Sequence, residues 1–144
     1  VGTGPEEDKI QRLADHINQQ TSKRIHLKKN VTDVSAFYAS IDALVLPSRD
    51  HDPFGLVAAE AMVCGTPVIV TDQCGIASYL TNEKDAIVVK AGSANALREA
   101  LIEMKNPEFR IRIAKEGQKT AQHTFSLKKM VDQYEALFTI GTHA

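Results

Sequence analysis

The apolar residues of this chain recur in two patterns, short continuous runs and helical stripes, which predict alternating strands and helices. Apolar runs at 43–47, 67–71 and 86–89 are typical of strands buried on both faces of a sheet. Ile25 and Leu27 alternate with polar neighbours and predict one more short strand. Apolar positions at helical spacing predict helices over 5–17, 33–40, 55–64, 94–104, 108–123 and 126–138.

Residues that favour helix ends and turns support these boundaries. Pro5 and the acidic residues 6–8 suit a first helical turn, because negative charge is favourable at that end of the helix dipole. Asp33 can cap the helix that follows it, and Gly65 is the type of residue that ends a helix. Residues 1–4 read as the end of a strand and a turn.

Short buried strands that alternate with helices predict an α/β fold. We expect a Rossmann-like, doubly wound parallel sheet with helices on both faces, formed by one domain over residues 1–144. Such sheets bind ligands beyond the carboxyl ends of their strands. The loops after Pro47, Thr71 and Val89 are therefore the expected location of a functional site.

Composition narrows the classes of partner. Lys and Arg number 17 and Asp and Glu 18, and this balance gives no support to nucleic-acid binding. No apolar run approaches the roughly 20 residues that a membrane-spanning helix needs. Cys64 and Cys74 fit neither a disulfide framework nor a zinc motif, so we expect a cytoplasmic protein without a metal site.

The segment 47–72 carries the candidate chemistry. Gly55 lacks a Cβ atom, so a ligand can approach the backbone where a helix begins, and the N–H groups of Gly55, Leu56 and Val57 suit a phosphate. Glu60 lies in the second turn of that helix and Asp52 in the preceding loop, and carboxylates accept hydrogen bonds from paired sugar hydroxyls. A lone Asp and Glu are most often surface residues; their place in this segment favours a site for a nucleoside diphosphate sugar.

This segment closely resembles the signature of the retaining glycosyltransferases of the GT-B fold that are called family 4 or group 1. The matching residues stand in the same register: Pro47-Ser48, Phe54-Gly55-Leu56-Val57, Glu60-Ala61-Met62 and Gly65-Thr66-Pro67-Val68-Ile69. The resemblance extends to Val1-Gly2-Thr3-Gly4-Pro5, Asn30-Val31-Thr32-Asp33-Val34 and the final helix, and so covers nearly the whole chain.

The resemblance implies a role for each matching residue. Glu60 would bind the ribose hydroxyls of the donor, and Asp52 would face the transferred sugar. The backbone of residues 54–57 (Phe54, Gly55, Leu56 and Val57) would line the phosphates, and Asn30 and Val31 would lie near the base. The family retains the anomeric configuration and uses neither a metal ion nor another cofactor. The base, the sugar and the acceptor stay open.

Three departures accompany the resemblance. Asp52 stands where the family has Glu, and residues 74–78 (Cys-Gly-Ile-Ala-Ser) lack the Pro and Glu of the family's loop. The basic residues that hold the phosphates in the family precede the segment that corresponds to Val1. We therefore expect the C-terminal, donor-binding part of the enzyme, truncated at its N-terminus, without the first strands and the acceptor domain and inactive alone.

Expectations about partners follow from the same reasoning. The donor would be a nucleotide sugar, and the acceptor a glycan or a lipid-linked saccharide bound through the missing domain. The full protein could associate peripherally with a membrane, and we expect either direct pairing of the remaining strands or self-association of the chain. Two alternatives stay open: an epimerase-like GT-B enzyme and a non-catalytic interaction domain. A dehydrogenase is disfavoured because Gly2 and Gly4 lack a third glycine at the required spacing.

Overall fold

A computed structural model describes residues 4–22 and 24–141, with their side chains as far as Phe138. The chain divides into two compact units, Val1–Phe37 and Tyr38–Ala144. Of the strand end predicted at 1–4, residues 1–3 lie outside the described part.

The first unit consists of a helix and an irregular segment. Helix α1 (Glu7–Gln20) begins with two acidic residues, as predicted, and buries Ala14. The strand predicted at Ile25 and Leu27 is wrong, because residues 24–28 are irregular. The side-chain amide of Asn18 takes the place of a neighbouring strand: its Nδ2 donates to the carbonyl of Ile25 at 2.8 Å, and its Oδ1 accepts from the N–H of Ile25 at 2.9 Å.

Helix α2 (Val34–Ser40) leads from the first unit into the second. Its start is fixed by Asp33, whose Oδ1 accepts a hydrogen bond from the N–H of Ala36 at 2.9 Å. Asp33 is therefore the capping residue that the sequence predicts. Of the residues of this helix, only Tyr38 is buried.

The second unit contains a parallel sheet of three strands, β1 (Leu44–Leu46), β2 (Val68–Thr71) and β3 (Ile87–Val89), in the order β1-β2-β3. The three runs predicted as buried strands thus pair directly with one another, with Val45, Ile69 and Ile87 in register. All residues of the central strand β2 are buried, which explains its uninterrupted apolar sequence.

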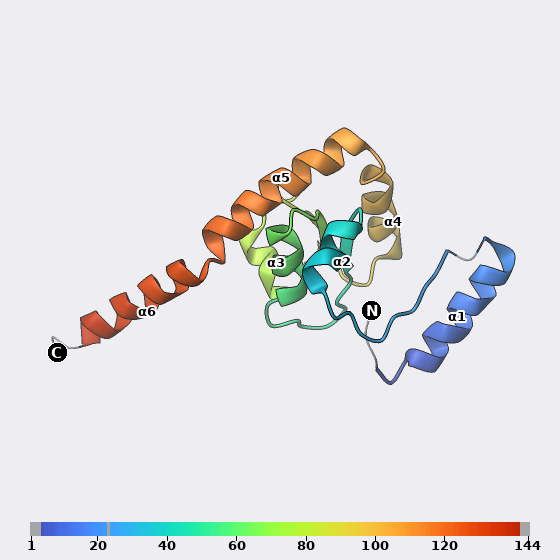
Figure 1. The fold of residues 1–144 in the computed structure, drawn as a ribbon, viewed down its shortest axis with the longest axis horizontal. Helices are drawn as coiled ribbons and strands as arrows, with labels where there is room; N and C mark the ends of the chain where they lie inside the picture. The colour runs from blue at the N-terminus through green and yellow to red at the C-terminus, as the bar shows by residue number, and fades with distance from the viewer. Residues whose placement is uncertain (1–3, 23, 142–144) are drawn as a thin grey trace. The chain divides into compact units, whose positions relative to one another are not determined.

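Helices cover both faces of this sheet. On one face, α4 (Ala94–Glu103) and α5 (Pro107–Thr124) enclose a core of Ile69, Ile87, Ala100, Met104 and Ile113. On the other face, α3 (Leu56–Val63) packs on β1 and β2 and runs beside α5, as Figure 1 shows. The predicted Rossmann-like α/β architecture is confirmed, and α3 begins at the carboxyl end of β1.

Local signals fix the later helices close to their predicted limits. The side chain of Asn106 accepts from the N–H groups of Glu108 and Phe109, and Pro107 occupies the first turn of α5. Helix α6 (Leu127–Gly141) follows, with Lys128 paired to Asp132 at 2.6 Å. Within the described residues, none of the helices has the length and apolar character needed to cross a bilayer.

Candidate donor site at the start of helix α3

The first feature of the site is the backbone turn at Gly55, which joins the loop after β1 to α3. Gly55 has φ 91° and ψ 49°, a left-handed conformation that glycine adopts without strain. A Cβ atom at Gly55 would lie 3.2 Å from side-chain carbons of Ile76 and Leu46. The left-handed turn therefore favours glycine at this position, and a larger residue would also require Ile76 and Leu46 to shift.

The start of α3 presents unoccupied hydrogen-bond donors. In the part of the chain that the structure describes, the N–H groups of Gly55, Leu56 and Val57 donate to no protein acceptor. Leu56 and Val57 are 67% and 44% exposed, whereas Gly55 itself is buried against Ile76 and Leu46. Free N–H groups at a helix N-terminus, together with the helix dipole, form a favourable anion site.

The loop that precedes α3 is held by the segment that follows β2. Asp52 donates its N–H to the carbonyl of Gln73 at 3.0 Å, and its own carbonyl accepts from Gly75 at 2.9 Å. The N–H of Ile76 donates to the carbonyl of Phe54 at 2.6 Å. These bonds continue the parallel pairing of β1 and β2 beyond the sheet and fix the position from which α3 starts.

Gly75 is what allows these two segments to approach so closely. A Cβ atom at Gly75 would lie 2.2 Å from the carbonyl oxygen of Pro53, a separation that real side chains do not tolerate. Residues 74–78 depart from the family pattern in lacking its Pro and Glu, and here Gly75–Tyr79 form a short 3-10 helix that the sequence did not predict. The two loops pair closely without that Pro and Glu.

The carboxylate of Asp52 is engaged with its own loop. Its Oδ1 accepts from the N–H of Phe54 at 3.2 Å, and its Oδ2 accepts from the hydroxyl of Ser48 at 3.3 Å. The N–H of Phe54 is thereby occupied, which leaves those of Gly55, Leu56 and Val57 for a ligand. Asp52 is half-buried and shapes the loop as an Asx turn does.

Glu60 lies in the second turn of α3 and is exposed. The hydroxyl of Tyr38 donates to its Oε2 at 3.0 Å. Tyr38 itself is only 4% exposed, and burial, together with this hydrogen bond, raises its pKa to about 12. The hydroxyl therefore stays protonated at physiological pH and continues to donate to the carboxylate.

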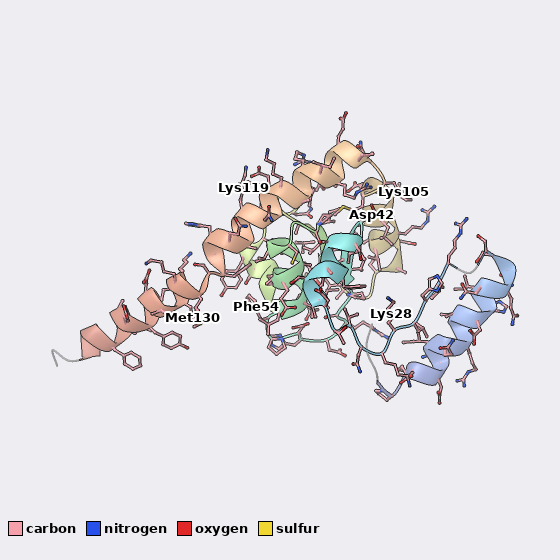
Figure 2. The ribbon with its side chains drawn as sticks, viewed as in Figure 1. Lys28, Asp42, Phe54, Lys105, Lys119 and Met130 are labelled. Carbon is pink, nitrogen blue, oxygen red and sulfur yellow. The ribbon has the colours of Figure 1, made fainter. Side chains whose placement is uncertain are left out.

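Aromatic rings support the loop from the other side. Phe54 packs edge to face on Tyr79 and Phe125, with ring centroids 6.2 and 5.3 Å apart, and Figure 2 labels Phe54 next to α3. Tyr79 and Phe125 also contact each other at 5.7 Å, so the three rings form a closed cluster. The side chain of Phe54 thus anchors the loop, while its N–H and carbonyl are engaged with Asp52 and Ile76.

The two remaining predicted site residues, Asn30 and Val31, belong to the first unit. Asn30 is exposed and Val31 half-buried in the irregular segment before α2, and both belong to the unit Val1–Phe37. Among the residues that the structure describes, no three His, Cys, Asp or Glu side chains gather as ligands of a metal ion would.

Sequence reasoning missed two residues of the site, Tyr38 and Gly75. Tyr38 was read only as an apolar position of α2, although its hydroxyl reaches a residue 22 positions away. Its distance from Glu60 in the chain hides the contact, since helical periodicity reports only which face of a helix is buried. Gly75 follows β2 in a loop, where glycine is common, so its position alone did not indicate the close backbone approach.

Comparisons with known proteins agree with this arrangement. The family model for glycosyl transferases group 1 matches residues 1–120. The lipopolysaccharide core biosynthesis glycosyltransferase LpsD of Rhizobium meliloti (strain 1021) is 31% identical over 142 residues, which cover 98% of this chain and 40% of LpsD. The chain thus spans about two fifths of the length of that relative.

Two solved structures share the fold. Sucrose-phosphate synthase from Thermosynechococcus elongatus is 28% identical with a TM-score of 0.80, over 96% of this chain and 37% of that protein. Anabaena HepE, crystallised in complex with UDP, has a TM-score of 0.82 at 21% identity, over 95% of this chain and 38% of HepE. Since the family model covers most of the sequence and LpsD aligns with almost all of it, the chain belongs to the group 1 glycosyltransferases.

Proposed function

We propose that this domain binds the nucleotide-diphosphate sugar from which a retaining glycosyltransferase moves a hexose to an acceptor such as a glycan or a lipid-linked saccharide. The observation that carries the proposal is the combination at α3: unoccupied N–H groups at Gly55, Leu56 and Val57, and the exposed carboxylate of Glu60 one turn further along. The UDP bound in HepE is consistent with a UDP-sugar as the donor.

Each group has a distinct part in this proposal. The N–H groups of Gly55, Leu56 and Val57 would bind the diphosphate and stabilise the negative charge that grows on it as the sugar departs. Glu60 would accept hydrogen bonds from the ribose hydroxyls. Asp52 would face the sugar, and Asn30 and Val31 would lie near the base. Catalysis would rest on positioning and charge stabilisation, with no metal ion, and no side chain of this domain is proposed as a covalent nucleophile.

We also propose how the acceptor is bound and where the protein is located. An acceptor would be bound by a further domain, so the chain alone is expected to bind nucleotide weakly and to transfer no sugar. Cys64 and Cys74 are both free thiols, which supports a cytoplasmic location.

Calorimetric titration of the chain with uridine, UMP and UDP tests the site. UDP should bind at least about tenfold more tightly than uridine, because the diphosphate meets the start of α3. Glu60→Ala should weaken UDP binding roughly ten- to hundredfold, since hydrogen bonds to a charged group contribute about 1.5–3 kcal/mol. Parallel titrations with GDP and ADP identify the base.

A matched control is Glu99→Ala, which removes an exposed carboxylate from α4 and should leave UDP binding unchanged. Equal affinities of the wild type for uridine and UDP would contradict the phosphate site. Absence of binding to all three nucleoside diphosphates, also with the acceptor domain attached, would favour a non-catalytic interaction domain of the same fold.

A further inference from the structure

The contact between Tyr38 and Glu60 joins a buried residue to an exposed one. The ring of Tyr38 is enclosed, while Glu60 on α3 is open to solvent, and the 3.0 Å hydrogen bond links the two. A buried hydroxyl needs a hydrogen-bond partner, and a backbone carbonyl can satisfy that need. The partner used here is the one side chain of α3 that carries a charge.

The backbone of Tyr38 is also fixed in place. The buried hydroxyl of Thr66 donates to the carbonyl of Tyr38 at 2.8 Å, and the N–H of Ile41 donates to the same carbonyl at 3.3 Å. Thr66 in turn follows α3 and donates its N–H to the carbonyl of Ala61. Tyr38 is therefore held at its backbone by the end of α3 and reaches with its hydroxyl to the middle of the same helix.

The consequence for Glu60 is a restricted side chain. A glutamate on an exposed helix surface samples several rotamers, and ordering it costs free energy when a ligand binds. The hydrogen bond from Tyr38 occupies Oε2, and Oε1 accepts no hydrogen bond from the described residues. A carboxylate accepts several hydrogen bonds, so Glu60 can hold the Tyr38 hydroxyl and still accept from a ligand.

We infer that Tyr38 is a positioning residue of the donor site: its hydroxyl holds the Glu60 carboxylate in the orientation that accepts the two ribose hydroxyls of a nucleoside diphosphate. This inference rests on the proposed function, because it assigns Glu60 to the ribose. It differs from a purely structural role for Tyr38 in one measurable respect. Loss of the hydroxyl should weaken only ligands that carry the ribose hydroxyls.

The test compares UDP with 2′,3′-dideoxy-UDP on four proteins: the wild type, Tyr38→Phe, Glu60→Ala and the double variant. Tyr38→Phe keeps the buried ring and removes only the hydroxyl. It should weaken UDP binding about three- to tenfold, the size of the free-energy cost of ordering one side chain, and leave binding of the dideoxy nucleotide unchanged. In the Glu60→Ala background, Tyr38→Phe should have no further effect on the affinity for UDP. The free-energy effects of two substitutions are not additive when both act through the same group.

The outcomes separate the two proposals. Suppose that Glu60→Ala abolishes the preference for UDP over its dideoxy analogue while Tyr38→Phe leaves the size of that preference unchanged. In that case the inference is wrong and the proposed function stands. Equal weakening of both nucleotides by Tyr38→Phe would mean that Tyr38 serves only the fold. If Glu60→Ala leaves the preference intact, or the wild type has none, the ribose assignment fails and the inference fails with it. Tyr134→Phe, which removes an exposed hydroxyl from α6, is the matched control.

Discussion

At the scale of single residues, Asp52 shows how one carboxylate can serve both the loop and the ligand. Its Oδ1 accepts from the N–H of Phe54, so the loop depends on an acceptor at that position. The family resemblance implies that the same carboxylate faces the transferred sugar. The two roles have different requirements. The loop needs only an oxygen that accepts a hydrogen bond, which an amide also supplies, whereas the sugar site would use the charged carboxylate.

Asp52→Asn separates these roles. Asparagine keeps the oxygen that caps Phe54, so we expect the free energy of unfolding to change by less than about 0.5 kcal/mol. Affinity for UDP-glucose should fall about three- to tenfold, as for one lost hydrogen bond, whereas affinity for UDP should not change. Calorimetry with both ligands measures the difference, with Asp50→Asn in the same loop as control. Equal effects on UDP and UDP-glucose would remove Asp52 from the sugar site.

Tyr38 gives a second residue-scale prediction, on alkaline stability. Its pKa is about 12 in the folded chain, above the ordinary value of 10.0, because burial and the hydrogen bond to Glu60 disfavour the phenolate. The unfolded chain therefore releases this proton at lower pH than the folded chain. The stability that this group contributes is complete below about pH 10 and is lost as the pH rises toward 12.

Urea denaturation between pH 8.5 and 11.5, at intervals of roughly half a unit, measures this loss across the interval between the unfolded and folded pKa values. Tyr38→Phe lacks the titrating group, so its stability should fall less steeply with pH than that of the wild type. Parallel curves for the two proteins would show that the Tyr38 hydroxyl is not shielded in the folded chain.

At the scale of elements, the pairing of the loop that precedes α3 with the segment that follows β2 is the feature with the clearest consequence. The segments 52–54 and 73–76 are joined by three backbone hydrogen bonds, of 2.6, 2.9 and 3.0 Å. A methyl group on Gly75 would collide with the carbonyl of Pro53, which is backbone and cannot move as a flexible side chain does. The loops must separate to accommodate it.

Gly75→Ala should therefore lower the free energy of unfolding by about 1–3 kcal/mol, as other overpacked positions do. Amide exchange at Asp52, Gly75 and Ile76 should accelerate, because their N–H groups make the bonds that are broken. Gly4→Ala is the control, since a Cβ atom there meets nothing within 4 Å. Unchanged exchange at all three amides would show that the loops tolerate the methyl group without parting.

The elements also show what can be predicted from sequence and what cannot. The three strands of the second unit and the limits of α3 follow from short-range signals: apolar runs, and glycines at 55 and 65 whose φ values are 91° and 79°. The strand predicted at Ile25 and Leu27 was wrong because alternating apolar and polar residues do not reveal whether a neighbouring strand exists. The side chain of Asn18 instead makes the hydrogen bonds to the backbone of Ile25. The Tyr38–Glu60 contact escaped because it joins separate elements.

At the scale of the whole molecule, burial is distributed very unevenly between the two units. Among the described residues, the unit Val1–Phe37 buries Ala14. The largest fully buried side chains of the described chain, including Met62, Ile69, Ile76 and Ile113, belong to the unit Tyr38–Ala144. Apolar burial is the dominant favourable term in folding, so the two units should differ in local stability.

Native-state hydrogen exchange followed by mass spectrometry resolves this difference peptide by peptide. Amides of α1 should exchange through local openings of low free energy, whereas those of β2 should exchange only on global unfolding, at the full free energy that denaturation measures. Saturating UDP should slow exchange at the start of α3 and raise global stability by about 2.7 kcal/mol at a hundredfold excess over Kd. Equal protection of α1 and β2 would mean that the two units unfold as one, and that the core of the second unit does not by itself set the stability of the donor site.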